Sequence, residues 1–185
     1  MFIQTEQTPN PATLKFLPGC AVMGSGTANF TESRSAARSP LAERLFALPE
    51  VTGVFLGADF ITVTKDGDSD WYQLKPAVLA AIMEHFTAGR PIITGDVGET
   101  AGTADSGEEE DEVVTQIKEL LETRVRPAVA MDGGDIIFED FEDGIVYLHM
   151  QGSCSGCPSS TATLKAGIEN MLRHYIPEVV EVRAV

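Results

Sequence analysis

Two cysteines three positions apart are the residues in this sequence whose types and spacing best suit metal or redox chemistry. Residues 152–158 read GSCSGCP, so Cys154 and Cys157 form a C-x-x-C pair. This spacing places both sulfurs on one turn, where they can bind one metal ion or form a disulfide with each other. The neighbouring glycines let the backbone approach a bulky group and adopt positive φ. The pair is therefore predicted to hold a metal centre.

One C-x-x-C pair supplies only half of a usual thiolate ligand set. Iron–sulfur clusters and all-cysteine zinc sites usually take four thiolates. The third cysteine, Cys20, lies in a predicted turn far away in the sequence and is interpreted as a spare thiol. A two-fold dimer that brings two C-x-x-C loops together completes the set. We therefore expect an iron–sulfur cluster shared between two copies of the chain, an exposed arrangement that suits transfer better than catalysis.

Three other interpretations of the pair stay open. A thiol–disulfide redox protein also places C-x-x-C between a strand and a helix, although here no aromatic residue precedes Cys154 and only one strand follows the helix. A zinc-stabilised interaction module would use the same sulfurs. Two incidental buried cysteines would need a less Gly- and Ser-rich loop. The helix that follows is expected to favour the thiolate form of the pair, through its N-terminal N–H groups and dipole.

A helix, a hairpin and a second helix must position the cysteines. Apolar residues recur at helical spacing from residue 113 to residue 125, until Pro127. The later elements are strands over 135–139 and 145–150 with a turn at 142–144, a helix over 159–174 and a strand over 179–182. The order is α-β-β-α-β. Asp132 and Asp135 flank two glycines and are expected to be turn and cap residues.

The first half of the chain reads as a small α+β domain without a catalytic constellation. Its predicted elements are a strand over 13–17, a helix over 40–48, strands over 54–56 and 60–64, and a helix beginning at 75. It shows no paired carboxylates, metal-ligand cluster or nucleophile–base pair. The histidines of the whole chain, at 85, 149 and 174, are interpreted as packing or surface residues rather than ligands.

The charge is concentrated between the two halves. Residues 96–112 contain eight acidic side chains and no basic one, a net charge of −8 out of −15 for the whole chain. Such a segment cannot bury enough apolar surface to offset its ordering entropy, so we predict a flexible acidic linker. An acidic docking tail for a basic partner is the alternative. The predicted organisation is an N-terminal domain over 1–95, the linker over 96–112 and a C-terminal domain over 113–185, giving a two-domain α+β protein.

Composition excludes several classes of partner. A net charge of −15 and a pI near 4.4 argue against nucleic acid and against an anionic membrane surface. No apolar run approaches the roughly 20 residues that span a bilayer. The first residues lack the basic and apolar regions of a secretory signal, and three cysteines make a poor disulfide framework. A cytoplasmic protein is expected.

Two motifs in this order resemble a known family, the NifU-like (Nfu-type) iron–sulfur scaffold proteins. Residues 131–136 (MDGGDI), a hairpin and residues 152–158 resemble the family's C-terminal domain. Residues 4–11 (QTEQTPNP), 14–16 (LKF) and 18–19 (PG) resemble its N-terminal domain. The likeness covers the chain apart from the acidic segment, and Cys20 has no family role.

The resemblance implies a carrier rather than an enzyme. Such a carrier binds a [4Fe–4S] cluster between two subunits of a homodimer, with Cys154 and Cys157 as the ligands of each chain. It receives the cluster from upstream cluster-assembly proteins and delivers it to apo iron–sulfur enzymes. The expected location is the bacterial cytoplasm, or an organelle matrix if the chain is a mature processed form.

Overall fold

The structure is a computed structural model of the 185-residue chain, and it describes residues 1–94, 112–155 and 158–185. The chain forms two compact units, Met1–Ala101 and Gly102–Val185, each with its own hydrophobic core. Both units combine helices with a sheet, which confirms the predicted two-domain α+β class. Most of the predicted acidic linker lies outside the described residues, and the boundaries at 95 and 113 stay a prediction.

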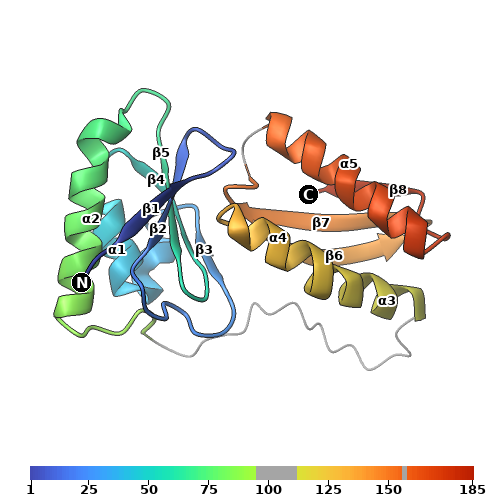
Figure 1. Ribbon diagram of the computed structural model, residues 1–185, viewed down its shortest axis with the longest axis horizontal. Helices are drawn as coiled ribbons and strands as arrows, with labels where there is room; N and C mark the ends of the chain where they lie inside the picture. Colours follow the sequence, from blue (N-terminus) through green and yellow to red (C-terminus); the bar gives the residue numbers. More distant parts are fainter. Residues whose placement is uncertain (95–111, 156–157) are drawn as a thin grey trace. The chain divides into compact units, whose positions relative to one another are not determined.

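The first unit is an antiparallel sheet covered on one face by helices (Figure 1). The strands lie in the order β1-β2-β5-β4-β3, with bounds β1 Gln4–Gln7, β2 Thr13–Leu17, β3 Ala28–Phe30, β4 Val51–Leu56 and β5 Ile61–Lys65. The helices are η1 Ser35–Arg38, α1 Pro40–Phe46 and α2 Trp71–Thr87. The core between helices and sheet is built from apolar side chains of β2, β4, β5, α1 and α2.

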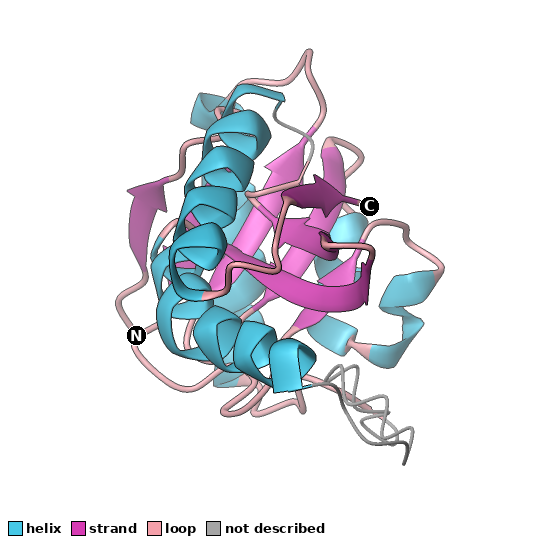
Figure 2. Cartoon of the chain, turned by 90° about the vertical axis from the view of Figure 1, so that its right-hand side faces the viewer, coloured by secondary structure: helices cyan, strands magenta, loops and turns pink. Residues whose placement is uncertain are grey.

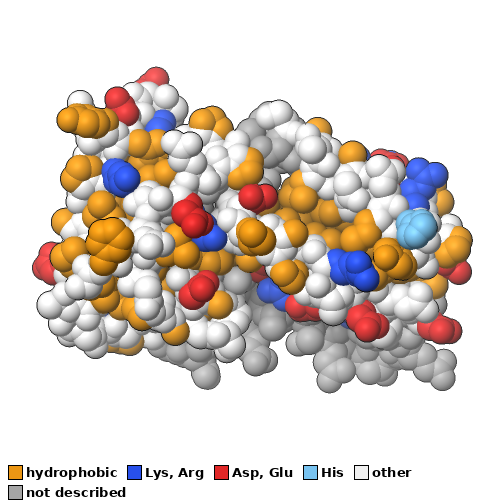
Figure 3. Space-filling model, viewed as in Figure 1, with side chains coloured by type: hydrophobic (Ala, Val, Ile, Leu, Met, Phe, Trp, Pro, Cys, Tyr) orange, Lys and Arg blue, Asp and Glu red, His pale blue; other side chains and the backbone are white. Residues whose placement is uncertain are grey.

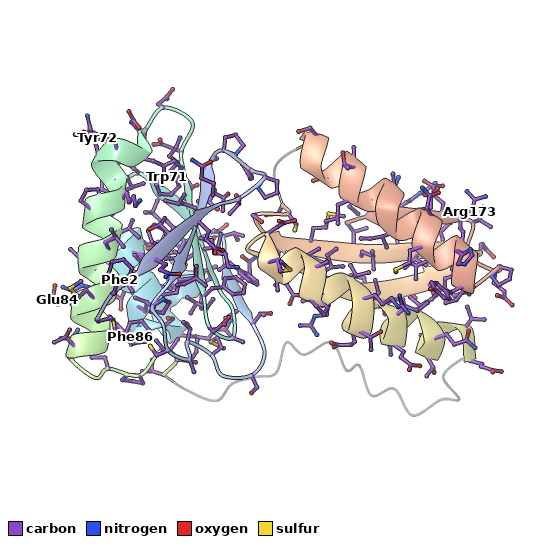
Figure 4. All side chains as sticks on the ribbon, viewed as in Figure 1. Phe2, Trp71, Tyr72, Glu84, Phe86 and Arg173 are labelled. Atoms are coloured by element: carbon purple, nitrogen blue, oxygen red, sulfur yellow. The ribbon has the colours of Figure 1, made fainter. Side chains whose placement is uncertain are left out.

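Two edge strands and the start of α2 differ from the prediction. β1 and β3 were not predicted, because β1 is wholly polar and β3 has only three residues; each is held by a single neighbouring strand. Helix α2 begins at Trp71 rather than residue 75, because Asp70 caps it by accepting a hydrogen bond from Tyr72 N at 3.0 Å. Figure 4 shows Trp71 at the start of α2; its ring centroid lies 6.4 Å from that of Phe16.

The second unit is a three-stranded sheet with helices packed on one face. The strands β6 Gly134–Glu142 and β7 Ile145–Gly152 form an antiparallel hairpin, and β8 Glu181–Ala184 runs parallel to β7. The helical segments are α3 Glu112–Leu120, the π-helical turn η2 Leu121–Val125, α4 Arg126–Met131 and α5 Pro158–Tyr175. Figure 2 shows helices layered against strands. Every second residue of β7 is buried, and these residues join helical side chains in one core.

The hairpin turn and the helix before it follow from local chemistry. Asp143 and Gly144 both have positive φ, 51° and 80°, as a two-residue hairpin turn of the I′ kind requires. The prediction that the first helix ends before Pro127 is wrong. Proline has no N–H and clashes with the carbonyl four residues earlier. Here Arg126 N donates to Leu121 O, five residues back, and this wider turn lets the helix continue to Met131.

Within the described residues, no helix is both long enough and apolar enough to cross a membrane.

Candidate functional site

Cys154 lies in the short segment that follows β7; its described residues, 153–155, are called the cysteine segment below. Its side chain is 5% exposed and belongs to the core of the second unit. Gly156 and Cys157 lie outside the described residues, so the predicted pairing of the two sulfurs stays a prediction. The expectation that a Gly- and Ser-rich loop would not bury a cysteine is wrong for Cys154.

Gly134 explains how this loop can bury a thiol. A Cβ atom at Gly134 would lie 2.5 Å from Cys154 Sγ and 2.8 Å from Gln151 O. The missing side chain at Gly134 therefore provides the space that the sulfur occupies. A cysteine from a loop is buried here because a glycine on the neighbouring strand leaves room for it.

A tight turn formed by residues 132–134 lies next to the cysteine segment, and we call it the glycine turn. Gly133 has a φ of 80°, a conformation that favours glycine. Ser153 N donates to Gly133 O at 3.2 Å, and Ser153 Oγ donates to Asp132 O. Two hydrogen bonds therefore join the residue before the cysteine to the glycine turn.

Hydrogen bonds to helix α5 and to the end of β7 also hold the cysteine segment. Thr161 Oγ1 donates to Cys154 O at 3.1 Å. Ser155 donates to Gly152 O through its backbone N at 3.2 Å and its Oγ at 2.9 Å. The segment is thus closed in this structure, with the thiol turned into the core.

The electrostatics of the closed segment favour the neutral thiol. The pKa of Cys154 is raised to about 11: burial is the largest cause, the interaction with the Ser153 side chain lowers the pKa, and the nearby Asp132 and Asp135 raise it. This shift is opposite in direction to the thiolate form that was expected for the pair, and burial of Cys154 is its largest cause. A bound metal ion would reverse this balance, since a coordinating thiol is deprotonated outright.

A buried ion pair fixes the other end of the glycine turn. Asp135 is 4% exposed. Its two carboxylate oxygens accept hydrogen bonds from Arg126 Nε and Nη2, both at 2.9 Å, and Oδ1 also accepts from Ile136 N at 2.8 Å. Arg126 in turn donates to Glu122, one helical turn back. Asp135 is thus more than the turn or cap residue that was predicted.

Arg126 is the residue of this site that sequence reasoning missed. An arginine directly before a helix-breaking Pro127, nine residues ahead of Asp135, was the available signal. A regular helix ending at residue 125 would have given it no defined direction. Only the π-helical turn, which cannot be read from apolar spacing, places its guanidinium beside the carboxylate.

The chain contains one further cysteine. Cys20 is exposed and belongs to the first unit. Among the described residues, which exclude Cys157, no three His, Cys, Asp or Glu side chains are gathered as a metal site. On the face shown in Figure 3, basic side chains are scattered among acidic and apolar ones rather than gathered in one basic surface.

Two family models match separate parts of the chain. The family described as "Scaffold protein Nfu/NifU N terminal" matches residues 3–89, and the "NifU-like domain" family matches residues 117–183. The second match contains the glycine turn, Arg126's partner Asp135 and both cysteines of the C-x-x-C pair.

Curated relatives match the chain over nearly its whole length. The human "NFU1 iron-sulfur cluster scaffold homolog, mitochondrial" is 55% identical over 186 aligned residues, which cover 100% of this chain and 72% of the relative. "NifU-like protein 4, mitochondrial" of Arabidopsis thaliana is 52% identical over 181 residues, which cover 97% of this chain and 64% of the relative. A solved NifU-like protein from Saccharomyces cerevisiae is 27% identical with a TM-score of 0.47, covering 52% of this chain and 87% of that one.

Proposed function

Because this chain belongs to the Nfu/NifU family of scaffold proteins, we propose that it is a non-enzymatic scaffold that binds an iron–sulfur cluster and delivers it to apo-proteins. The observation that carries the proposal is the C-x-x-C pair within the NifU-like domain, with Cys154 seated against Gly134 at the end of β7. The relatives named above are described as iron–sulfur cluster scaffolds or NifU-like proteins.

Cys154 and Cys157 are the proposed ligands, and two chains supply them. Four thiolates usually hold a cluster, so a [4Fe–4S] cluster between two subunits would use the pair from each. A cluster held in this way lies at a subunit interface and can be handed on by exchange of ligands, without a complete protein cage to dismantle.

The burial of Cys154 implies a step before cluster binding. With its thiol turned into the core and its pKa raised, Cys154 is not presented as a ligand to iron in this conformation. Cluster loading therefore requires Cys154 to turn outward from the core. The three hydrogen bonds of Ser153 and Thr161 that close the cysteine segment are the contacts that this movement must break.

The proposed partners are upstream cluster-assembly proteins as donors and apo iron–sulfur enzymes as recipients. The N-terminal domain is proposed to recognise recipients, while the acidic segment gives the cluster domain reach. The mitochondrial names of the relatives favour an organelle matrix as the location, with the bacterial cytoplasm as the other possibility.

Anaerobic reconstitution with iron and sulfide tests the proposal. The full chain is expected to gain charge-transfer absorbance and about four irons per dimer, and to form dimers only when loaded. Cys154→Ala and Cys157→Ala should each lose the colour, the iron and the dimer, whereas Cys20→Ala, the matched control, should keep all three.

Other results would favour the alternatives. A colourless monomer with a reducible Cys154–Cys157 disulfide would support a thiol–disulfide redox protein. One tightly bound zinc ion with no response to iron and sulfide would support an interaction module. Iron bound equally well by the cysteine variants would remove the pair from the site.

A further inference from the structure

The Arg126–Asp135 pair has a geometry that a surface ion pair lacks. The guanidinium meets the carboxylate through two parallel hydrogen bonds of 2.9 Å, the fork arrangement that gives such pairs both energy and direction. The Asp135 side chain is 5% exposed, compared with 31% for Arg126. A pair that excludes water from one partner to this extent is costly to break.

The glycine turn connects this ion pair to the cysteine segment. Asp135 directly follows Gly134, the residue whose missing side chain makes room for Cys154 Sγ. The carbonyls of Asp132 and Gly133, at the other end of the glycine turn, accept the two hydrogen bonds from Ser153. The contacts therefore run from Arg126 through Asp135 and the glycine turn to the residue next to the thiol.

The π-helical turn η2 explains why Arg126 can serve this purpose. One extra residue in a helical turn rotates every later side chain by about 100° relative to a regular helix. The hydrogen bond from Arg126 N to Leu121 O marks this extra residue directly at the arginine. With this rotation the guanidinium reaches both Glu122 on its own helix and Asp135 at the start of β6.

We propose that Arg126 is a positioning residue for Cys154. Through Asp135 it holds the glycine turn in the shape that seats the thiol, and it thereby sets how often the cysteine segment opens to present the thiol. The importance of this opening for cluster loading rests on the proposed function, but the opening itself is a property of the cluster-free chain.

Alkylation of the cluster-free, full-length protein with N-ethylmaleimide measures the opening. In a Cys157→Ser background, mass spectrometry of peptides follows Cys154, and the exposed Cys20 in the other domain serves as an internal reference. We expect Arg126→Met and Asp135→Asn each to raise the ratio of Cys154 to Cys20 alkylation rates by about tenfold, because the glycine turn that seats the thiol would lose support on the order of one charge-assisted hydrogen bond.

Two control variants separate positioning from loss of stability. Glu122→Gln removes only the more exposed partner of Arg126 and should change the ratio by less than about twofold. Gly144→Ala strains the distant hairpin turn, where φ is 80° and a Cβ would lie 2.8 Å from Val180 Cγ2. If global unfolding exposed the thiol, Gly144→Ala would raise the ratio as much as Arg126→Met at matched loss of Tm.

Arg126→Lys keeps the positive charge but cannot form the two parallel hydrogen bonds. Its ratio of Cys154 to Cys20 alkylation rates should lie between those of the wild type and Arg126→Met. An unchanged ratio in a folded Arg126→Met or Asp135→Asn protein, or an equal rise in Gly144→Ala, overturns the inference. Asp135→Asn retains the shape of the side chain and supplies the measurement if Arg126→Met does not fold. A wild-type chain that takes up no cluster would count against the proposed function alone, because the alkylation ratio is measured without iron.

Discussion

The imidazole of His85 is buried in the first domain, and one of its two nitrogen atoms is not hydrogen-bonded within the described residues. The side chain is 1% exposed, and within the part of the chain that the structure describes, its Nε2 atom has no hydrogen-bond partner. Burial lowers the pKa of His85, and the positive charges of Arg90 and Arg44 lower it further, against the raising effect of backbone hydrogen bonds. The folded domain therefore holds His85 neutral.

His85 should make the first domain lose stability in acid. Between the ordinary pKa of 6.5 and the lower folded value, the unfolded chain binds a proton that the folded domain does not. The free energy of unfolding should therefore decrease as the pH falls below about 6.5. Urea unfolding followed by the fluorescence of Trp71, the chain's only tryptophan, measures it.

His85→Phe keeps an aromatic ring without the charge and should flatten this pH dependence. His174→Asn, which changes an exposed histidine of the other domain, is the control and should leave the slope unchanged. An equally steep slope in His85→Phe would assign the acid sensitivity to other groups.

The burial of Cys154 is explained only when it is considered together with Gly134. In the sequence, Cys154 indicated a ligand of an exposed cluster, and Gly134 was only one of the two glycines between Asp132 and Asp135. A Cβ atom at Gly134 would lie 2.5 Å from Cys154 Sγ, so the absence of that side chain makes room for the thiol. The expected state of Cys154 in the cluster-free protein therefore changes from an exposed thiolate to a buried thiol.

At the scale of elements, helix α1 is anchored by its cap. Ser39 is fully buried; its Oγ accepts from Ala42 N at 3.2 Å and donates to Ile92 O at 2.6 Å. The hydroxyl thus caps the helix and also ties it to the segment that follows α2. Helix α2 is capped more simply, since Asp70 Oδ1 accepts from Tyr72 N at an exposed position.

Ser39→Ala should therefore cost more stability than Asp70→Ala. Loss of the cap and of a buried hydrogen bond together should lower the free energy of unfolding by about 2 kcal/mol. Loss of the exposed cap alone should cost about 1 kcal/mol or less. Trp71 fluorescence in urea reports both variants, and equal costs would mean that the bond to Ile92 O contributes nothing.

The π-helical turn is a feature that the sequence pattern did not predict. Pro127 signals the end of a helix, and the apolar spacing before it agrees. The structure instead widens one turn and continues to Met131. The consequence reaches beyond the helix, because this turn directs Arg126 toward Asp135.

At the scale of the whole molecule, the two units should behave independently. Each has its own core and its own sheet, and the family matches fall on the two units separately. A variant such as Ser39→Ala should therefore shift only the transition of the first domain when unfolding is followed by calorimetry. A single transition that moves as a whole would instead show that the domains unfold together.

Removing residues 1–95 tests the proposed division of labour. The remaining chain should still bind a cluster upon reconstitution, because both proposed ligands lie in the second domain. Transfer to a recipient apo-enzyme should become slower, since the proposed recognition domain is gone. The measurement is the rate at which the recipient's activity appears, with the full chain as control. Unchanged transfer would remove recognition from the first domain.

The sequence by itself determined the features that depend on neighbouring residues. The C-x-x-C pair, the hairpin with its Asp143–Gly144 turn, the α-β-β-α-β order and the two-domain α+β class follow from local spacing, turn residues and hydrophobic period, and the structure and the family matches agree on the fold. The edge strands β1 and β3 were not predicted from the sequence, because three or four residues without alternating apolar side chains carry no such signal.

The tertiary structure decided everything that depends on residues meeting from different elements. The burial of Cys154 comes from the absent side chain of Gly134 across the hairpin, and the direction of Arg126 comes from a widened helical turn facing the start of β6. Desolvation and packing are set by such distant neighbours rather than by spacing along the chain. For that reason the sequence indicated which residues carry the chemistry, while only the fold showed that the Cys154 thiol is buried.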